Sequence, residues 1–474
     1  MQIRSDIPAR LDRLPWTRWH WRVVIALGVA WVLDGLEVTI VGSLGSVLER
    51  PDTLGLSAEQ VGWSGSLYVG GAVIGALLFG RAADRLGRKR LFQLTLAVYM
   101  AASVATAFAD GFVWFAVCRF LTGLGIGGEY AAINSAIDEL IPARVRGRVN
   151  LAINGSFWIG AAIGALISLA LLDARVLGPQ GWRAGFLIGA VLAVAIALVR
   201  RHVPESPRWL LAHGRDGDAE RIVAQVERTA GLSAPGPEAV GDGVTRPRRG
   251  TPSLREVWHV LARRYRTRSA VVLALMVSQA FFYNAIFFTY ALVLTRFHGV
   301  DATRVGLYIV PFAAGNVLGP LLLGPLFDRI GRRPMIAATY ALSGLTLLLT
   351  GIGFVAGVLD ALTQTLAWSV VFFLASAAAS SAYLTVSEVF PLQMRALAIS
   401  LFYAVGTGVG GFAAPALFGA LIETGSRANV FVGYAIGAVL VLLAAAVAWR
   451  WAVDAERKPL EEVAPPLGSE AEVR

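Results

Sequence analysis

The chain has little of what an enzyme or a soluble domain would need. Its 474 residues include one cysteine and five histidines, and only 16% of them are charged, whereas soluble domains carry about 25%. A single cysteine, Cys118, excludes an intrachain disulfide and most cysteine-based metal sites. No Ser/His/Asp set, histidine-rich cluster or nucleotide-binding loop stands out, so we expect no enzyme activity, no metal and no cofactor.

Apolar residues make up most of the chain. They account for 56% of it, and the mean hydropathy is +0.62. The net charge of +10 does not indicate nucleic-acid binding, because membrane proteins collect lysine and arginine in their cytoplasmic loops. The partner that this composition predicts is a lipid bilayer.

Twelve apolar runs are long enough to cross a bilayer as a helix, which takes about 20 residues. The sequence therefore predicts an all-α membrane protein with 12 transmembrane helices. The predicted spans are 22–48, 60–82, 90–109, 112–138, 147–172, 182–201, 269–297, 304–327, 334–357, 362–390, 396–424 and 427–451.

A charged, glycine-bounded loop occurs twice between predicted spans. Residues Gly80–Arg90 (GRAADRLGRKR) reappear about half a chain later as Gly324–Pro334 (GPLFDRIGRRP). The repeats indicate duplication, and two pseudo-symmetric six-helix bundles that rock around a shared site are typical of secondary transporters. A second repeat consists of Glu139 with Arg146, matched by Glu388 with Arg395.

Lysine and arginine are densest on the side that these loops share, so we expect that side and both termini to be cytoplasmic in a multi-pass inner or plasma membrane protein. Within the connection between the halves, 216–230 has the pattern of an amphipathic helix, 232–250 is expected to be flexible, and 254–268 to be a helix on the membrane surface or in the cytoplasm. The predicted parts are a cytoplasmic N-terminus (1–21), an N-terminal bundle (22–201), a cytoplasmic linker (202–268), a C-terminal bundle (269–453) and a mobile cytoplasmic tail (454–474).

These motifs resemble those of the major facilitator superfamily. Gly80–Arg90 is similar to the hallmark loop between its second and third helices, and Arg119–Glu129 (RFLTGLGIGGE) to the fourth-helix motif of proton-coupled members. Pro204–Leu211 (PESPRWLL) resembles the sugar-porter signature after the sixth helix. Asp34–Val38 (DGLEV) resembles the first helix of the branch that holds synaptic-vesicle-protein-like proteins and niacin or aromatic-acid/proton symporters. The resemblance implies alternating access by a monomer.

Two departures from known family patterns narrow the range of expected substrates. The helix-seven string of sugar porters survives only as Gln279 and Asn284, and the Gly-Pro motif of drug antiporters is missing from 154–160. The resemblance therefore favours proton-coupled symport of a small organic metabolite, and the favoured substrate is an organic or aromatic acid. The alternatives are a sugar or polyol symporter, a drug/proton antiporter and, from another class, a transport-inactive membrane receptor or binding protein.

Ionisable groups in mid-membrane cost about 2.5–3.5 kcal/mol on insertion scales and are usually functional or paired. Asp34 and Glu37 are three residues apart, on one face of the first helix, while Arg119 and Glu129 belong to the fourth. We expect Arg119 to pair with Asp34 or Glu37, and protonation of that acid to bias alternating access. The resemblance assigns the facing acid to Asp34. A static ion pair is the alternative; Glu37 is also a candidate substrate contact, and Glu129 is either a second protonation site or a structural acid.

Charged residues at the cytoplasmic helix ends are predicted to form a network of ion pairs that closes that side, with membrane topology alone as the alternative role. The predicted gate residues are Asp84, Arg85, Arg88, Glu139, Arg146, Glu205, Arg208, Asp328, Arg329, Arg332, Glu388 and Arg395.

Polar and aromatic residues of the inner helices are predicted to face a substrate cavity, with interhelical hydrogen bonds as the alternative role. Arg119 is expected to make this cavity net positive, which suits an anion. The predicted substrate residues are Asn154, Trp158, Gln279, Tyr283, Asn284, Tyr383 and Tyr403.

Overall fold

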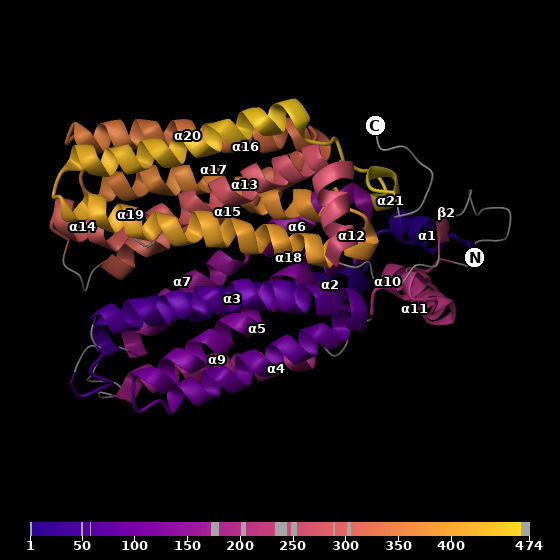
Figure 1. Ribbon diagram of the computed structural model, residues 1–474, viewed down its shortest axis with the longest axis horizontal. Coiled ribbons are helices and arrows are strands. Elements are labelled where there is room, and N and C mark those ends of the chain that lie inside the picture. The colour runs from indigo at the N-terminus through magenta and orange to yellow at the C-terminus, as the bar shows by residue number, and fades with distance from the viewer. Residues whose placement is uncertain are drawn as a thin grey trace.

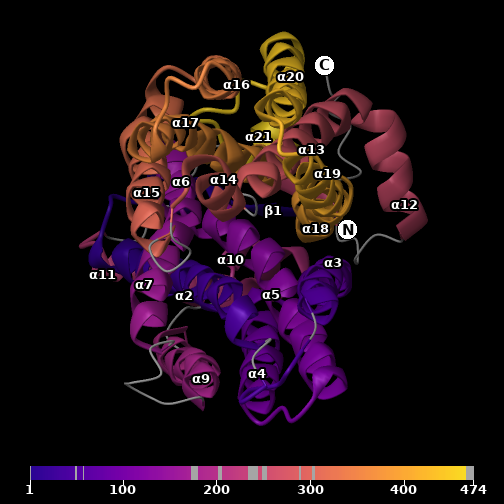
Figure 2. The same cartoon turned by 90° about the vertical axis from the view of Figure 1, so that its left-hand side faces the viewer.

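The structure is a computed structural model that describes residues 2–48, 51–56, 58–171, 180–200, 205–232, 244–247, 254–287, 290–300 and 305–465. Long helices run along the longest axis of the molecule in two layers (Figure 1). Helices of the first half of the chain form the lower, indigo-to-magenta layer, and helices of the second half form the upper, orange-to-yellow layer. The end-on view shows the same two groups facing each other (Figure 2).

The helices of the first half lie within residues 18–200. They are α2 (Arg18–Leu48), α3 (Ala58–Leu86), α4 (Arg88–Ala107), α5 (Phe112–Leu140), the 3₁₀ turn η1 (Ala143–Val145), α6 (Arg146–Gly155), α7 (Phe157–Leu171) and α9 (Gly181–Arg200).

The helices of the second half lie within residues 266–451. They are α13 (Arg266–Phe287), α14 (Tyr290–His298), α15 (Val305–Arg329), α16 (Arg332–Val355), α17 (Ala361–Glu388), the 3₁₀ turn η6 (Leu392–Met394), α18 (Arg395–Gly406), the π-helical turn η7 (Thr407–Gly411), α19 (Phe412–Glu423) and α20 (Arg427–Trp451).

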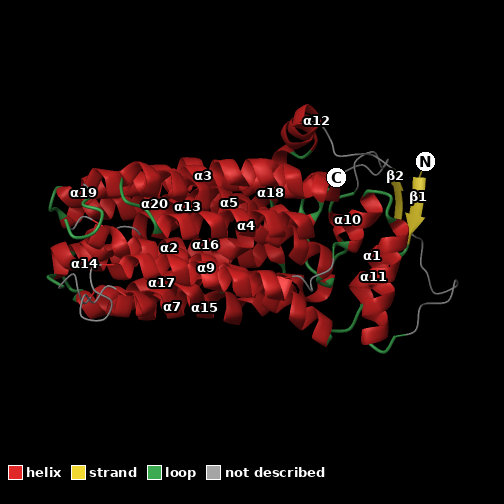
Figure 3. Cartoon of the chain, turned by 90° about the horizontal axis from the view of Figure 1, so that it is seen from below, coloured by secondary structure: helices red, strands yellow, loops and turns green. Residues whose placement is uncertain are grey.

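Short elements gather at one end of these helices (Figure 3). They are β1 (Gln2–Ser5), α1 (Ile7–Arg13), α10 (Pro207–Ala212), α11 (Asp216–Thr229), β2 (Val244–Pro247), α12 (Leu254–His259), the π-helical turn η4 (Val260–Arg264) and α21 (Leu460–Val463). We call this end of the molecule the α1 side.

Ten helical spans among the described residues are long and apolar enough to cross a bilayer, and they agree with ten of the twelve spans expected from the sequence. The expected sixth span coincides with α9, several side chains of which lie outside the described residues. The expected eleventh span is not one regular helix, because the turn Thr407–Gly411 separates α18 from α19. The first helix starts at Arg18, four residues before the expected start.

Glycines let α3 and α5 approach until their backbones touch. A Cβ on Gly71 would overlap the carbonyl oxygen of Phe120, and one on Gly123 would overlap that of Tyr68. Small residues at such crossings are what hold helices together where lipid removes the hydrophobic driving force. This contact places Tyr68 and the functional residues of α5 at a fixed separation.

Gly71→Ala is therefore expected to destabilise the protein, although alanine is the better helix former by about 1 kcal/mol. Forcing the two backbones apart costs about 1–3 kcal/mol, the range for overpacked cores. Thermal unfolding in detergent measures the change. The matched control is Gly70→Ala on the same helix, where an added Cβ meets nothing within 4 Å; an equal effect of both variants would contradict the close-packing argument.

Two segments expected to be flexible or mobile, and part of the predicted cytoplasmic N-terminus, form ordered elements on the α1 side. Part of the N-terminus forms α1, and Leu11 of α1 and Leu14, which follows it, are buried in one cluster with Trp209 of α10 and Val223 of α11. Part of the expected flexible linker forms β2, which pairs antiparallel with β1. In the expected mobile tail, Leu460 of α21 is buried. Buried apolar side chains in α1 and α21 explain why these two segments are ordered, because a short amphipathic helix folds once a partner surface is available.

The amphipathic helix expected at 216–230 is present as α11, and it carries a buried ion pair with α1. Arg10 donates to both carboxylate oxygens of Glu227 at 2.7 and 3.0 Å, and the Glu227 side chain is 1% exposed. Arg13 donates to the same carboxylate at 3.2 Å. The Arg10 guanidinium holds the pKa of Glu227 below its ordinary value of about 4.5.

Glu227→Gln is expected to lower stability at neutral pH by on the order of 2 kcal/mol, the worth of a charge-assisted hydrogen bond. Because the folded-state pKa is depressed, this stabilisation is complete above about pH 4.5 and is lost as the pH falls through the folded pKa. Thermal unfolding at a series of pH values from 7 downward checks this prediction: the difference in stability between the two proteins should narrow as the pH falls. Glu220→Gln, at the half-exposed partner of Arg10, is the control with a smaller effect.

Candidate functional site

A buried ion pair joins α2 and α5 in the first half. Arg119 donates to Oε1 of Glu37 at 2.7 Å, and the two residues are 2% and 3% exposed. The Arg119 guanidinium also lies 4.6 Å from the ring centre of Tyr68 on α3, in cation–π contact. The sequence left Asp34 and Glu37 open as partners, and the resemblance pointed to Asp34; the structure pairs Arg119 with Glu37.

Asp34 is held by hydroxyl groups. Tyr130 of α5 donates to Oδ2 at 2.8 Å, and Tyr68 lies 3.5 Å from Oδ1. Asp34 is 7% exposed. It lies one helical turn from Glu37, so the two acids share a face of α2 but meet different neighbours on α3 and α5. Chemically, Asp34 is a buried acid that forms no ion pair within the described residues and can exchange a proton.

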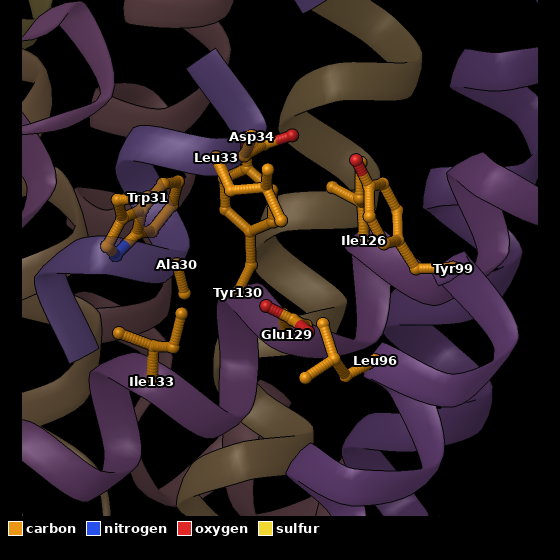
Figure 4. Close-up of a pocket in the computed structure, with 10 residues that line it drawn as sticks. All are labelled: Ala30, Trp31, Leu33, Asp34, Leu96, Tyr99, Ile126, Glu129, Tyr130 and Ile133. Carbon is orange, nitrogen blue, oxygen red and sulfur yellow. The ribbon is translucent and has the colours of Figure 1, made fainter. Parts of the chain in front are cut away.

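Glu129 lies beside a small cavity that Asp34 also lines. This cavity has a volume of about 20 Å³, and its wall includes Leu96 and Tyr99 of α4. In Figure 4, Asp34 is at the top of the view and Glu129 is below it, with Tyr130 between them. The two acids therefore belong to one local site formed by α2, α4 and α5.

A larger cavity of about 240 Å³ lies between the two halves of the chain. All seven residues predicted to face a substrate line it: Asn154, Trp158, Gln279, Tyr283, Asn284, Tyr383 and Tyr403. Several of them also make interhelical contacts; Tyr283 donates to Asn316 at 2.8 Å, for example. The same side chains therefore line the cavity and, in part, form hydrogen bonds between helices.

The larger cavity has no charged side chain among its lining residues in the described part of the chain. The expectation of a net positive cavity is thus wrong. Arg119 points instead to Glu37, which neutralises it, and Tyr68 covers the guanidinium. The cavity presents hydroxyl and amide groups set in an aromatic wall.

Tyr130, which was not among the predicted site residues, connects the two halves. Tyr130 lines both cavities, donates to Asp34 and stacks on Tyr403 of α18 with ring centres 4.7 Å apart. Trp31, which lies 4.3 Å from the Tyr130 ring, was also missed. Its position one turn before Asp34 was the available signal, since residues three apart share a helix face.

Asp328 ties the halves together on the α1 side. Its carboxylate, at the end of α15, accepts the backbone N–H groups of Gly147 at 3.1 Å and Arg148 at 2.8 Å. These N–H groups belong to the first turn of α6, where a helix has no internal acceptors and favours negative charge. An acid of the second half therefore caps a helix of the first half.

A buried group of charges surrounds this cap. Arg332 donates to both oxygens of Glu388 at 2.9 and 3.0 Å, and to Asp328 at 2.9 Å. Arg146 of the first half lies 3.5 Å from Glu388 and 3.6 Å from Asp12 of α1. All of these side chains except Asp12 are less than one-tenth exposed. Together they connect the two halves and the N-terminal segment.

The repeated loops have the same local structure in both halves. Gly87 and Gly331 adopt positive φ angles of 92° and 123°, just before α4 and α16 begin. A carboxylate then accepts a first-turn N–H in each case: Glu205 from Lys89, and Glu456 from Arg332, both at 3.2 Å. The role of Glu456 was missed because the tail was expected to be mobile.

The remaining predicted gate residues divide into three groups. Arg208 is buried and donates to Asp12 at 2.9 Å and to the carbonyl oxygen of Glu139 at 3.0 Å; Arg395 is buried and donates to the carbonyl oxygen of Phe390 at 3.3 Å. Arg85 and Arg329 are exposed. The side chains of Asp84 and Arg88 lie outside the described residues.

Asp328→Asn is expected to weaken the closed contact on the α1 side. Hydrogen bonds to a charged group contribute about 1.5–3 kcal/mol, and Asp328→Asn removes this charge from the closed state. The equilibrium between open and closed states should therefore shift toward the open state by at least about tenfold. The measurement is the rate at which Ser380→Cys, in the cavity wall, is labelled from the α1 side in a Cys118→Ser background. Arg329→Gln, at the exposed neighbour, is the control. Equal labelling of both variants would refute the closing role of Asp328.

Comparisons with known proteins agree on the kind of molecule. A family model described as "Sugar (and other) transporter" matches residues 19–465. The chain is 29% identical over 413 residues to the niacin transporter NiaP of Acinetobacter baylyi, which covers 86% of this chain and 89% of the relative. It is 27% identical over 451 residues to the 4-hydroxybenzoate transporter PcaK of the same species, covering 94% and 93%.

Solved structures share the fold. The proton:xylose symporter XylE bound to 6-bromo-6-deoxy-D-glucose superposes with a TM-score of 0.75 at 19% identity, covering 94% of this chain and 98% of that one. A partially occluded inward-open structure of XylE from Escherichia coli gives a TM-score of 0.66 at 20% identity, covering 91% and 98%. At these identities the likeness concerns architecture alone.

Proposed function

The chain belongs to the sugar (and other) transporter family of the major facilitator superfamily, and from this premise we propose that it carries a small aromatic or other organic acid across the membrane together with protons. It is a multi-pass membrane transporter rather than an enzyme. The single observation that carries the substrate class is the larger cavity, whose wall is aromatic, polar and without charge in the described residues.

The shape and chemistry of this cavity suit a flat ring. Trp158 of the first half faces Tyr283 of the second with ring centres 5.9 Å apart, and Tyr130 faces Tyr403. Side-chain amides of Asn154, Gln279 and Asn284 line the same space. Gln279 and Asn284 can offer N–H donors to a carboxylate, whereas the Asn154 amide nitrogen already donates to Asn150. Two relatives are named for niacin and 4-hydroxybenzoate, each an aromatic ring with one carboxyl group, which supports this substrate class.

Proton coupling is assigned to Asp34, with the Glu37–Arg119 pair beside it. A buried acid among neutral hydroxyls is costly when ionised, so proton loss must accompany a change in its surroundings. Tyr130 connects Asp34 to Tyr403 of the other half, and movement of the halves would alter that environment. The protonation state and the conformational equilibrium thereby bias each other.

The orientation of the protein in the membrane is inferred from the charges on the α1 side. Arg85, Arg144, Arg148 and Arg329 are exposed at the helix ends there, and arginine-rich loops face the cytoplasm in membrane proteins. We therefore assign the α1 side to the cytoplasm. The Asp328 cap and the Glu388 ion pairs then form the inner gate, and the chain works as a monomer because both halves of its cavity come from one molecule.

A sugar or polyol is the second candidate substrate. Amide and hydroxyl groups such as Gln279, Asn284 and Ser380 also suit sugar hydroxyls, and Trp158 offers a face for stacking. The clustered aromatic rings of Tyr130, Tyr383 and Tyr403 in the cavity wall favour the acid, because aromatic rings stack or pack edge to face with another flat ring.

Uptake into proteoliposomes tests both the substrate and the coupling. Purified protein is reconstituted and given radiolabelled nicotinate, 4-hydroxybenzoate or xylose, with and without an inward proton gradient. Gradient-driven accumulation of an aromatic acid supports the proposal, and accumulation of xylose alone supports the sugar alternative. Binding without flux for every compound indicates the transport-inactive receptor, and outward flux driven by the gradient indicates an antiporter.

A further inference from the structure

Asp34 faces away from the cavity proposed for substrate. Asp34 lines the small cavity and is absent from the lining of the larger one. Trp31, Ile126 and Tyr130 line both cavities and therefore form the wall between them. The Tyr130 hydroxyl donates to the Asp34 carboxylate from this wall, and the hydroxyl of Tyr68, which lines the larger cavity, lies 3.5 Å from the same carboxylate. Substrate and proton thus have separate compartments that share a tyrosine partition.

The small cavity has the size and the polar groups of an internal water site. Its volume of about 20 Å³ exceeds the roughly 10–15 Å³ that one water needs. Asp34, Glu129 and Tyr99 supply polar atoms from α2, α5 and α4 (Figure 4). The Tyr99 hydroxyl is buried and makes no hydrogen bond of normal geometry within the described residues. Two to four polar partners around such a space are what an ordered water requires.

We propose that the small cavity is a proton-relay site, in which one bound water connects the Asp34 carboxyl to the Glu129 carboxylate along a path separate from the substrate cavity. The proposal rests on the proton coupling proposed above and extends it. It assigns a ligand, water, to this cavity and a relay role to Glu129.

The transfer itself is a balanced exchange of one proton. The O–H bond of protonated Asp34 breaks as the water oxygen gains that proton, and a second O–H bond of the water breaks as a Glu129 oxygen gains its proton. The water is regenerated, Asp34 becomes a carboxylate and Glu129 becomes neutral. One proton shared between two neighbouring acids also avoids placing two negative charges together in a medium of low dielectric constant.

The order of the groups along the helices gives the path a direction. On α5, Glu129 is ten residues nearer the α1 side than Arg119, about 15 Å along the axis. On α2, Asp34 is one turn nearer that side than Glu37. The sequence from the Arg119–Glu37 pair to Asp34 to Glu129 thus leads toward the α1 side, where the inner gate lies.

The other ionisable groups near Asp34 are poorer proton acceptors than Glu129. Arg119 is neutralised by Glu37, so neither takes the proton of Asp34 without breaking the ion pair. The remaining neighbours are tyrosines, which donate hydrogen bonds but stay protonated. The titratable groups that interact with Asp34 from its own and the surrounding helices are Glu37, Tyr68, Tyr99, Glu129, Tyr130, Tyr383 and Tyr403.

The test separates driven uptake from exchange. Loss of a positioned acid or base slows the proton-transfer step by about 10²-fold or more. In proteoliposomes, Glu129→Gln should therefore reduce gradient-driven uptake of the aromatic acid by at least about tenfold. Exchange of labelled for unlabelled substrate should continue, because it needs no net proton movement. Glu129→Asp should restore part of the driven uptake, since the acid is kept.

A second pair of variants tests the water site itself. Ala30→Val adds two carbons at a residue that lines only the small cavity, and it should slow driven uptake with exchange retained. Ala26→Val makes the same change at a buried position one turn away that lines neither cavity, and it should behave like the wild type. Thermal unfolding of all variants separates a folding defect from a relay defect.

The outcomes distinguish this inference from the proposed function. If wild-type protein moves no aromatic acid by exchange or by gradient, the proposed substrate class fails. If wild type accumulates the acid and Glu129→Gln does so equally well, the relay is overturned while proton-coupled transport stands. If exchange falls with driven uptake in a folded Glu129→Gln variant, Glu129 acts on substrate or structure and the relay is again overturned.

Discussion

Asp34→Asn is expected to abolish uphill accumulation of substrate while leaving exchange in place. Asparagine keeps the size of the side chain, and its one amide oxygen can still accept the Tyr130 hydroxyl that donates to Asp34 at 2.8 Å, but it has no proton to exchange. A gradient of one pH unit is worth about 1.4 kcal/mol per proton, or about tenfold accumulation. The variant should therefore stop at equal concentrations inside and outside.

The measurement is the steady-state ratio of labelled acid in proteoliposomes with an imposed proton gradient, together with substrate-induced proton uptake reported by a pH dye. Asp110→Asn, at an exposed acid between α4 and α5, is the matched control and should accumulate like the wild type. Intact accumulation in Asp34→Asn would show that the proton binds elsewhere. The Tyr130–Asp34 contact would then be structural.

Arg119→Gln is expected to destabilise the protein strongly, because it leaves Glu37 buried without its cation. Removing one partner of a buried ion pair costs about 3–5 kcal/mol, whereas removing both charges together is often close to neutral. The double variant Glu37→Gln/Arg119→Gln should therefore recover most of the stability lost by Arg119→Gln alone. Unfolding in detergent with increasing denaturant measures the three proteins.

The same series reveals whether the pair also takes part in coupling. A static ion pair predicts that the double variant, once folded, accumulates substrate like the wild type. A pair that opens during transport predicts restored stability with accumulation still lost. If Arg119→Gln is as stable as the wild type, the pair contributes nothing to folding, contrary to its 2.7 Å contact and its burial.

The architecture could be predicted largely from local signals. Hydrophobic length fixes membrane helices because an unsatisfied backbone cannot cross lipid, and the repeated loops Gly80–Arg90 and Gly324–Pro334 indicated two related halves. The seven polar and aromatic residues expected to face the centre line the larger cavity. Those predictions needed only the helix in which a residue lies and the polarity of its side chain.

The predictions that were wrong or incomplete share a different cause. Asp34 and Glu37 lie about 4.5 Å apart along one helix face, so the choice of partner for Arg119 depends on the height at which α5 crosses α2. The charge of the cavity depends in turn on that pairing. The packing of α1 and α21 was missed because their few apolar residues acquire a partner only after the halves and the linker meet.

The sequence by itself determined that this protein is a helical, duplicated membrane transporter, since span length, loop charge and repeats are properties of neighbouring residues. Only the tertiary structure decided which acid neutralises Arg119, that the larger cavity is uncharged in its described lining, and that Asp34 and Glu129 share a second, smaller cavity. These features depend on the rotation and height of packed helices. Helix contacts fix those variables through glycines such as Gly71 and Gly123, across residues far apart in the chain.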